Sequence, residues 1–305
     1  MKQILKIILT ISLLWLVLRQ VDIETALELY ISADHALLIV ATVLLVLLLV
    51  PASLRWRYVL RTFELSFPFM LLLQWNLAAS FFNNILPTGI GGDVMRTAWC
   101  RRAGLPVASA LESVVIDRLA AFVSLLLLVF VSLPFAAPFM DISGAQLLLW
   151  PVGALVVLAG GLGVLILLEQ LQLKSTQYLG AILRRAETGM VNPALLAKIL
   201  ASGVATHVIR VLGIWLIARA LHIDITLTAS LVLFPVALLL AMIPVTIGGW
   251  GLREGVFVVV LSQVHVSAVA AATLSVVYGL ANLVTSLPGA VVWLHLGSNG
   301  GIDRK

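Results

Sequence analysis

The chain has 305 residues, of which 62% are hydrophobic and only 11% are charged. Soluble domains are roughly 45–50% apolar and about 25% charged, so this chain has too few polar residues to cover a water-exposed surface. The mean hydropathy of +1.13 and the long runs of Leu, Val, Ile and Ala exclude an ordinary soluble domain and a disordered chain. The composition therefore predicts an all-α polytopic membrane protein, with residues 1–305 as a single integral membrane domain.

The net charge of +5 comes from 19 Lys and Arg against 14 Asp and Glu. Most of the cations lie at the ends of apolar runs, where insertion topology and anionic headgroups account for them without a nucleic-acid partner. The single cysteine, Cys100, excludes a disulfide framework, and the five histidines lack the spacing of a metal site. We therefore expect no metal, no cofactor and no catalytic residues, and the chain is not predicted to be an enzyme.

Six stretches are candidate transmembrane helices, because about 20 mainly apolar residues cross a bilayer. In chain order they are residues 4–18, 36–54, 107–133, 147–168, 195–218 and 268–294. The first has a basic start and no obvious cleavage site, which predicts an uncleaved signal anchor. Two further apolar stretches, 67–90 and 227–247, end in Pro and paired Gly. The predicted number of transmembrane helices is therefore six to eight.

An internal repeat is the most informative feature of the sequence. Residues 86–96 and 243–253 both fit the pattern [LI]-P-x-x-I-G-G-x-x-x-R, and the repeat halves extend over about 36–133 and 195–294. Pro87 and Pro244 each end a helix, because proline removes a donor and clashes with the preceding turn. The glycine pairs permit a sharp reversal of the backbone; they are Gly91, Gly92, Gly248 and Gly249. Both segments are predicted to be re-entrant, dipping into the bilayer and returning.

The distribution of cations predicts the topology. If both chain termini are cytosolic and the Pro-Gly-Gly segments are re-entrant, most of the Lys and Arg fall on the cytosolic side, as the positive-inside rule requires. The two motifs are then separated by an odd number of crossings and open to opposite faces, which makes an inverted repeat in the plasma (inner) membrane. If both segments cross fully, the two copies are parallel instead.

Interrupted helices at matching positions of inverted halves mark the binding region of many transporters. The helix that restarts after each motif offers free N–H groups and a positive dipole end, and an arginine follows in each copy. This combination suits a phosphate. Charged residues within spans cost about 2.5–3.5 kcal/mol each, so they face protein or water. The predicted substrate-binding residues are Arg96, Arg118, Arg210, Arg253, Glu254, Asp117 and Asn84.

Structural roles remain open for several of these residues. Arg96 also fits a cytosolic anchor, and the charges at Asp117 and Arg118 also fit an interhelical ion pair that fixes packing. The asparagines Asn83 and Asn84 also fit caps of broken helices. Tryptophans near span ends, Trp56 among them, are predicted to be interfacial anchors.

The two motif blocks, together with the helix that carries Asp117-Arg118, resemble the lysylphosphatidylglycerol synthase transmembrane family. The resemblance covers nearly the whole chain and includes Gly251 and Arg253-Glu254 of the second block. It implies the flippase-like half of MprF-type proteins, here as a standalone member without the synthase domain. Aminoacyl transfer is therefore not part of what the resemblance implies.

Two functions from different classes follow. The first is a lipid translocator that moves a phosphate-containing lipid, of the aminoacyl-phosphatidylglycerol or polyprenyl-linked glycolipid type, across the inner membrane. The alternative is a lipid-binding or assembly protein that transports nothing and serves a separate glycosyltransferase or lipid-modifying enzyme. A transporter of a small soluble anion is less favoured, because only Glu112 and Asp117 stand as ion-coupling groups. The oligomeric state is left open.

Overall fold

The computed structural model describes residues 23–85, 90–135, 192–242 and 251–298, and every regular element in these ranges is helical. The expected spans 4–18 and 147–168 lie outside the described residues, as do Pro87, Pro244, Gly248 and Gly249. The elements are α2 (Ile23–Ile31), α3 (His35–Leu47), α4 (Leu49–Arg61), α5 (Phe69–Ile85), α6 (Gly91–Arg102), α7 (Val107–Ser132), η1 (Leu133–Phe135), α10 (Pro193–Ala220), α11 (Leu227–Ala241), α12 (Leu252–Leu261), η3 (Ser262–Val264), α13 (Ala268–Ser286) and α14 (Pro288–Ser298).

Four of the helical stretches are long and apolar enough to cross a membrane. They are His35–Arg61, Val107–Ser132, Pro193–Ala220 and Ala268–His295, which have 26 to 28 residues each. The first joins α3 to α4 through Leu48, and the last joins α13 to α14 through Leu287, just before Pro288. Four of the six predicted spans are therefore confirmed as helices of membrane-crossing length.

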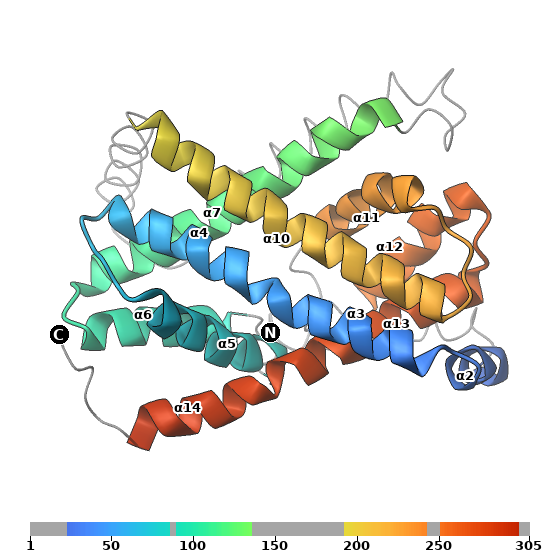
Figure 1. Ribbon diagram of the computed structural model, residues 1–305, viewed down its shortest axis with the longest axis horizontal. Helices are drawn as coiled ribbons and strands as arrows, with labels where there is room; N and C mark the ends of the chain where they lie inside the picture. Colours follow the sequence, from blue (N-terminus) through green and yellow to red (C-terminus); the bar gives the residue numbers. More distant parts are fainter. Residues whose placement is uncertain (1–22, 86–89, 136–191, 243–250, 299–305) are drawn as a thin grey trace, which may run out of the picture.

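The long helices run along the long axis of the molecule (Figure 1). The Asp34 N–H donates to the Ala220 carbonyl oxygen at 2.9 Å, so the start of α3 lies beside the end of α10. At the opposite end Ile199, near the start of α10, packs in one cluster with Trp56 of α4. The α3–α4 helix and α10 are therefore antiparallel neighbours.

The helices α7 and α10 cross at a glycine, which has no side chain to keep the two backbones apart. A Cβ atom on Gly203 of α10 would lie 2.1 Å from the Ser124 hydroxyl oxygen of α7. The Ser124 hydroxyl also lies 3.3 Å from the Leu200 carbonyl oxygen, to which it donates. The two helix backbones approach closely at this point, as small residues allow in membrane proteins.

Four short helices form two pairs, and each motif begins after the first helix of its pair and runs into the second. Within the predicted stretch 67–90, Phe69–Ile85 form α5, which packs against α6; within 227–247, Leu227–Ala241 form α11, which packs against α12. With 10 to 17 residues each, these helices are shorter than the roughly 20 residues of a full span. Figure 1 shows α5 and α6 toward one end of the long axis and α11 and α12 toward the other.

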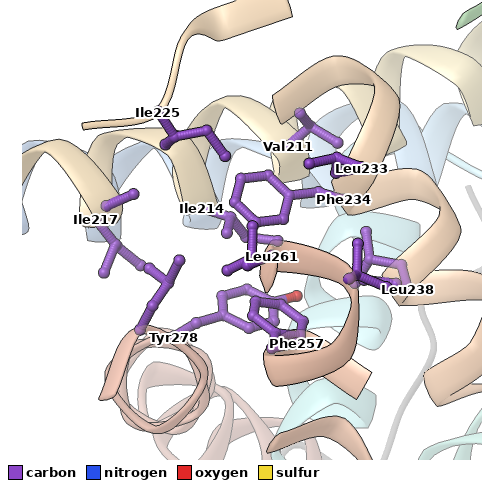
Figure 2. Packing of buried hydrophobic residues seen from close by; sticks show 14 of the residues in the cluster. Val211, Ile214, Ile217, Ile225, Leu233, Phe234, Leu238, Phe257, Leu261 and Tyr278 are labelled. Carbon is purple, nitrogen blue, oxygen red and sulfur yellow. The ribbon is translucent and has the colours of Figure 1, made fainter. Parts of the chain in front are cut away.

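Apolar side chains form two clusters. The larger cluster, shown in Figure 2, combines α10, α11, α12 and α13, and its rings stack: Phe257 lies 5.7 Å from Phe234 and 6.3 Å from Tyr278, centroid to centroid. The tryptophan cluster combines α4, α5, α6 and the start of α7 around Trp56, Trp75 and Trp99. In the described part of the chain, the long helices α3–α4, α7 and α10 supply buried residues to both clusters. The pair α5–α6 contributes to the tryptophan cluster, and the pair α11–α12 contributes to the larger one.

Candidate functional site

Asp117 is the centre of a buried ion network between three helices. Its side chain on α7 is 3% exposed, and its two oxygens accept hydrogen bonds from arginines of α4 and α6. Arg55 donates through Nε at 2.8 Å and through Nη2 at 3.3 Å, and Arg96 donates through Nη2 at 2.8 Å. A carboxylate so buried needs this pairing to remain charged, and Asp117 in turn ties α4, α6 and α7 together.

Asp93 forms the second carboxylate of the network. It stands in the first turn of α6 and accepts a hydrogen bond from Arg118 Nε, while the Arg96 guanidinium lies 3.8 Å away. The Arg118 side chain is 49% exposed, whereas Arg55, Arg96 and both carboxylates are nearly covered. Three arginines share two aspartates, so these five side chains carry one net positive charge, and Arg118 is the accessible member.

Arg96 is held from a further direction by an aromatic ring. Its guanidinium carbon lies 3.9 Å from the centroid of Trp56, a cation–π contact that orients the planar group. Trp56 is fully buried, so its prediction as an interfacial anchor is wrong. The helix α4 continues to Arg61, beyond the predicted end at residue 54, and this extension carries Trp56 into the protein.

The second motif ends in its own charged cluster, between α12 and α13. Arg253 and Glu254 are adjacent on α12, and Arg253 Nη2 donates to Glu254 Oε1 at 2.7 Å. Ser275 of α13 accepts from Arg253 Nε at 3.1 Å and donates to Glu254 Oε1 at 3.2 Å. The side chains of Arg253 and Glu254 are 13% and 1% exposed. This cluster balances one positive charge with one negative charge, in contrast to the first.

The starts of α6 and α12 carry acceptors from the chain itself. The Gly92 N–H donates to Asn83 Oδ1 of α5 at 2.9 Å, and Asp93 adds negative charge to that first turn. The Gly251 N–H donates to Glu254 Oε2 at 2.6 Å, with Gly251 in the left-handed region at φ 84°. At each helix end one N–H is therefore bonded within the chain, and an acidic side chain stands near the positive dipole end. The sequence predicted free N–H groups here, whereas the Gly92 and Gly251 N–H groups have acceptors from the chain itself.

Two predicted binding residues lie apart from these bonded clusters. Asn84 is exposed, and its Nδ2 donates to the Ser80 carbonyl oxygen of its own helix. Arg210 is partly buried on α10, one turn from His207. His207 Nε2 lies 2.9 Å from the Ala121 carbonyl oxygen, which only accepts, so this nitrogen carries the proton. In the described residues the hydrogen-bond partners of Asp117 are Arg55 and Arg96, and neither Asn84 nor Arg210 is among them.

The predicted binding residues did not include Arg55, Asp93 or Ser275. Nor did the sequence predict that Asn83 would bond to Gly92. Arg55 directly follows the apolar run 36–54 and so resembled a flanking cytosolic cation. Asp93 lies inside the first motif, where its acidic side chain, one turn from Arg96, was the available signal. Ser275 gave no signal, because a serine within an apolar helix is common and its partner lies 21 residues away.

The comparison with protein families gives one match. A family described as "Lysylphosphatidylglycerol synthase TM region" matches residues 3–289, a range that contains both charged clusters and both motifs. No curated protein matches the chain.

Proposed function

The chain belongs to the lysylphosphatidylglycerol synthase transmembrane family, and from that membership we propose that it is a lipid translocator. Its cargo would be a phosphate-containing lipid of the aminoacyl-phosphatidylglycerol or polyprenyl-linked glycolipid type. The headgroup would move through the polar clusters while the acyl or prenyl tails remain in the bilayer. In this proposal the protein carries out no bond chemistry and acts in the inner membrane.

The ion network around Asp117 is the observation that carries this proposal. Asp117 lies ten residues into α7, about 15 Å along the helix axis, which is membrane depth for a core about 30 Å thick. Buried charges at that depth are expensive and usually mark a substrate path. The excess positive charge, with Arg118 half exposed, favours an anionic headgroup, and arginine binds phosphate oxygens bidentately.

The order and direction of the helices support the inverted arrangement that the sequence predicts. The helices α3–α4 and α10 are antiparallel, and each precedes a pair of short helices that contains a motif. Figure 1 has these pairs at opposite ends of the long axis. We propose that both pairs are re-entrant from opposite faces, that the α5–α6 pair and both chain termini are cytosolic, and that α11–α12 faces outward. The total would be six crossing helices.

The two clusters would then act in turn. Arg118 and Arg96 receive the phosphate at the α6 side, and Arg253 receives it at the α12 side. The helix α13, which holds Ser275, also contacts α5 of the α5–α6 pair. The α6 side and the α12 side of the proposed path therefore adjoin each other at α13. The neutral balance of Arg253 with Glu254 makes the second site the weaker anion binder, which favours release there.

Lipid movement in proteoliposomes tests the proposal. Fluorescent phosphatidylglycerol, its lysyl form and a short polyprenyl phosphate are offered to the wild type, to Arg118→Gln and to the double variant Arg96→Ala/Arg253→Ala. We expect one lipid to move in the wild type, and its rate to fall at least about tenfold in both variants, since each loses charge-assisted bonds to phosphate. Arg219→Gln is the matched control, because that side chain is equally exposed, at 50%, and pairs with Asp224 in a loop.

Failure of every lipid to move, with folded protein that still binds lipid, would contradict translocation. That outcome would favour the alternative, a lipid-binding protein that serves a separate glycosyltransferase or lipid-modifying enzyme. If Arg219→Gln lost as much lipid movement as Arg118→Gln, general surface charge rather than the ion network would drive the movement.

A further inference from the structure

The Arg253 side chain lies in a slot on α13 that three residues form. Ser275, Tyr278 and Gly279 are spaced i, i+3 and i+4 and therefore share one face of that helix. Ser275 bonds Arg253 Nε, and the Tyr278 ring centroid lies 5.7 Å from the guanidinium carbon. Gly279 supplies the floor of the slot.

Gly279 leaves the space that the guanidinium fills. A Cβ atom there would lie 2.3 Å from Arg253 Nη2 and 2.9 Å from both Cζ and Nη1. These distances are far shorter than van der Waals contact, so a methyl group and the guanidinium cannot occupy their present places together.

The backbone does not explain a glycine at this position. Gly279 lies inside α13, and it is not among the residues with positive φ in the described chain. Alanine is the better helix former in such a place. The requirement for glycine therefore comes from Arg253 and not from the conformation of α13.

The guanidinium cannot move aside without losing its partners. Arg253 Nη2 is held by Glu254 Oε1 at 2.7 Å, and the same carboxylate accepts from the Ser275 hydroxyl at 3.2 Å. Glu254 Oε2 in turn holds the Gly251 N–H at the start of α12. Displacement of Arg253 from the slot would thus disturb both the ion pair and the cap of α12.

We propose that Gly279 is a positioning residue for Arg253: its missing side chain fixes the guanidinium against α13, in the place where the second cluster meets the lipid headgroup. The positional part stands on geometry alone, and the part that concerns the headgroup rests on the proposed function. The role belongs to Gly279 and not to helix glycines in general. The Cβ position of Gly255, on α12 itself, has nothing within 4 Å.

A double-mutant cycle on stability tests the positional part without any transport measurement. Gly279→Ala is compared in the wild type and in Arg253→Ala by thermal unfolding of the full chain in detergent. The loss of the arginine partner of Glu254 is common to both Arg253→Ala proteins and cancels in the cycle. We expect Gly279→Ala to lower the melting temperature when Arg253 is present, and to leave it unchanged or raise it in Arg253→Ala.

Two glycines serve as controls. Gly255→Ala has open space and should not lower the melting temperature in either background. Gly213→Ala places its Cβ 2.6 Å from Leu45 Cδ2, a clash with an apolar side chain, and should lower it equally in both. If Gly279→Ala alone fails to fold, rescue by Arg253→Ala supports the proposal. An equal effect of Gly279→Ala in both backgrounds, or no rescue, overturns it.

Lipid movement in the same proteins tests the link to the headgroup. With fluorescent lysyl-phosphatidylglycerol or whichever of the three lipids moves, Gly279→Ala should slow the wild type as much as Arg253→Ala does, and add nothing to it. Full wild-type movement in Gly279→Ala, while Arg253→Ala is slow, would overturn that link. If the wild type itself moves no lipid, the proposed function fails, whereas the stability cycle still decides the role of Gly279.

Discussion

At the scale of single residues, Asp117 is the acidic side chain on which the buried charges depend. Substitution of Asp117 by Asn keeps the shape but removes the negative charge that Arg55 and Arg96 share. Loss of one partner from a buried ion pair costs about 3–5 kcal/mol. We expect Asp117→Asn to lower the free energy of unfolding by this amount, measured in mixed SDS micelles by tryptophan fluorescence.

Asp224→Asn is the control for this prediction. The Asp224 side chain is 98% exposed and lies 3.4 Å from Arg219, and exposed pairs contribute about 0–1 kcal/mol. If the Asp117→Asn protein unfolded at the same SDS fraction as the Asp224→Asn protein, the ion network would add no stability.

Residue by residue, the sequence predicted charge but not pairing. Asp117 and Arg118 were found because charges inside apolar helices are costly, and Arg96 and Arg253 because an arginine follows each Pro-Gly-Gly motif. The choice of Arg55 as the closest partner of Asp117 was not predictable, because the two are 62 residues apart and meet only through the packing of α4 on α7.

At the scale of helices, the start of α6 depends on a side chain from α5. Asn83→Ala removes the oxygen that accepts the Gly92 N–H, and loss of such a cap costs about 0.5–2 kcal/mol. We expect that loss in the same SDS unfolding measurement. Asn84→Ala should change the free energy of unfolding little, because Asn84 is exposed and bonds only the Ser80 carbonyl oxygen of its own helix.

The two asparagines separate stability from binding. A loss of lipid movement in Asn84→Ala without loss of stability would agree with the prediction that Asn84 contacts the headgroup. Equal destabilisation by both alanine variants would contradict the capping role assigned to Asn83.

The sequence predicted the helices better than their contacts. Apolar length placed α7 at 107–133 against an observed Val107–Ser132, and α10 at 195–218 against Pro193–Ala220. The prolines and paired glycines in the sequence also distinguished the stretches that contain the short helices α5 and α11 from the stretches that form the long helices. Which helices would be neighbours depended on close approaches such as that of Gly92 to the Ala79 carbonyl oxygen, which no periodicity encodes.

At the scale of the whole molecule, labelling of single cysteines tests the proposed topology. Asp224→Cys and Arg102→Cys, each in a Cys100→Ala background, place thiols on exposed positions near opposite ends of the bundle. A membrane-impermeant maleimide should label Asp224→Cys in intact cells and Arg102→Cys only after permeabilisation. Labelling of both from the same side would contradict the proposed crossings.

The wild type is the control for this experiment. Cys100 lies in α6, outside the four candidate spans, and burial raises the pKa of its thiol to about 12. Since the thiolate is the reactive form, almost none is present near neutral pH, and the wild type should remain unlabelled in both conditions.

The crossing of α7 and α10 at Gly203 and Ser124 has a mechanical consequence. These helices, like the α3–α4 helix, supply buried residues to both apolar clusters, so we expect a rotation of one cluster relative to the other to change the angle between α7 and α10. With no side chain on Gly203 to interlock, the contact acts as a pivot. Rocking of the two ends in opposite senses would therefore be easiest about the point where the helices already touch, a few turns from Asp117.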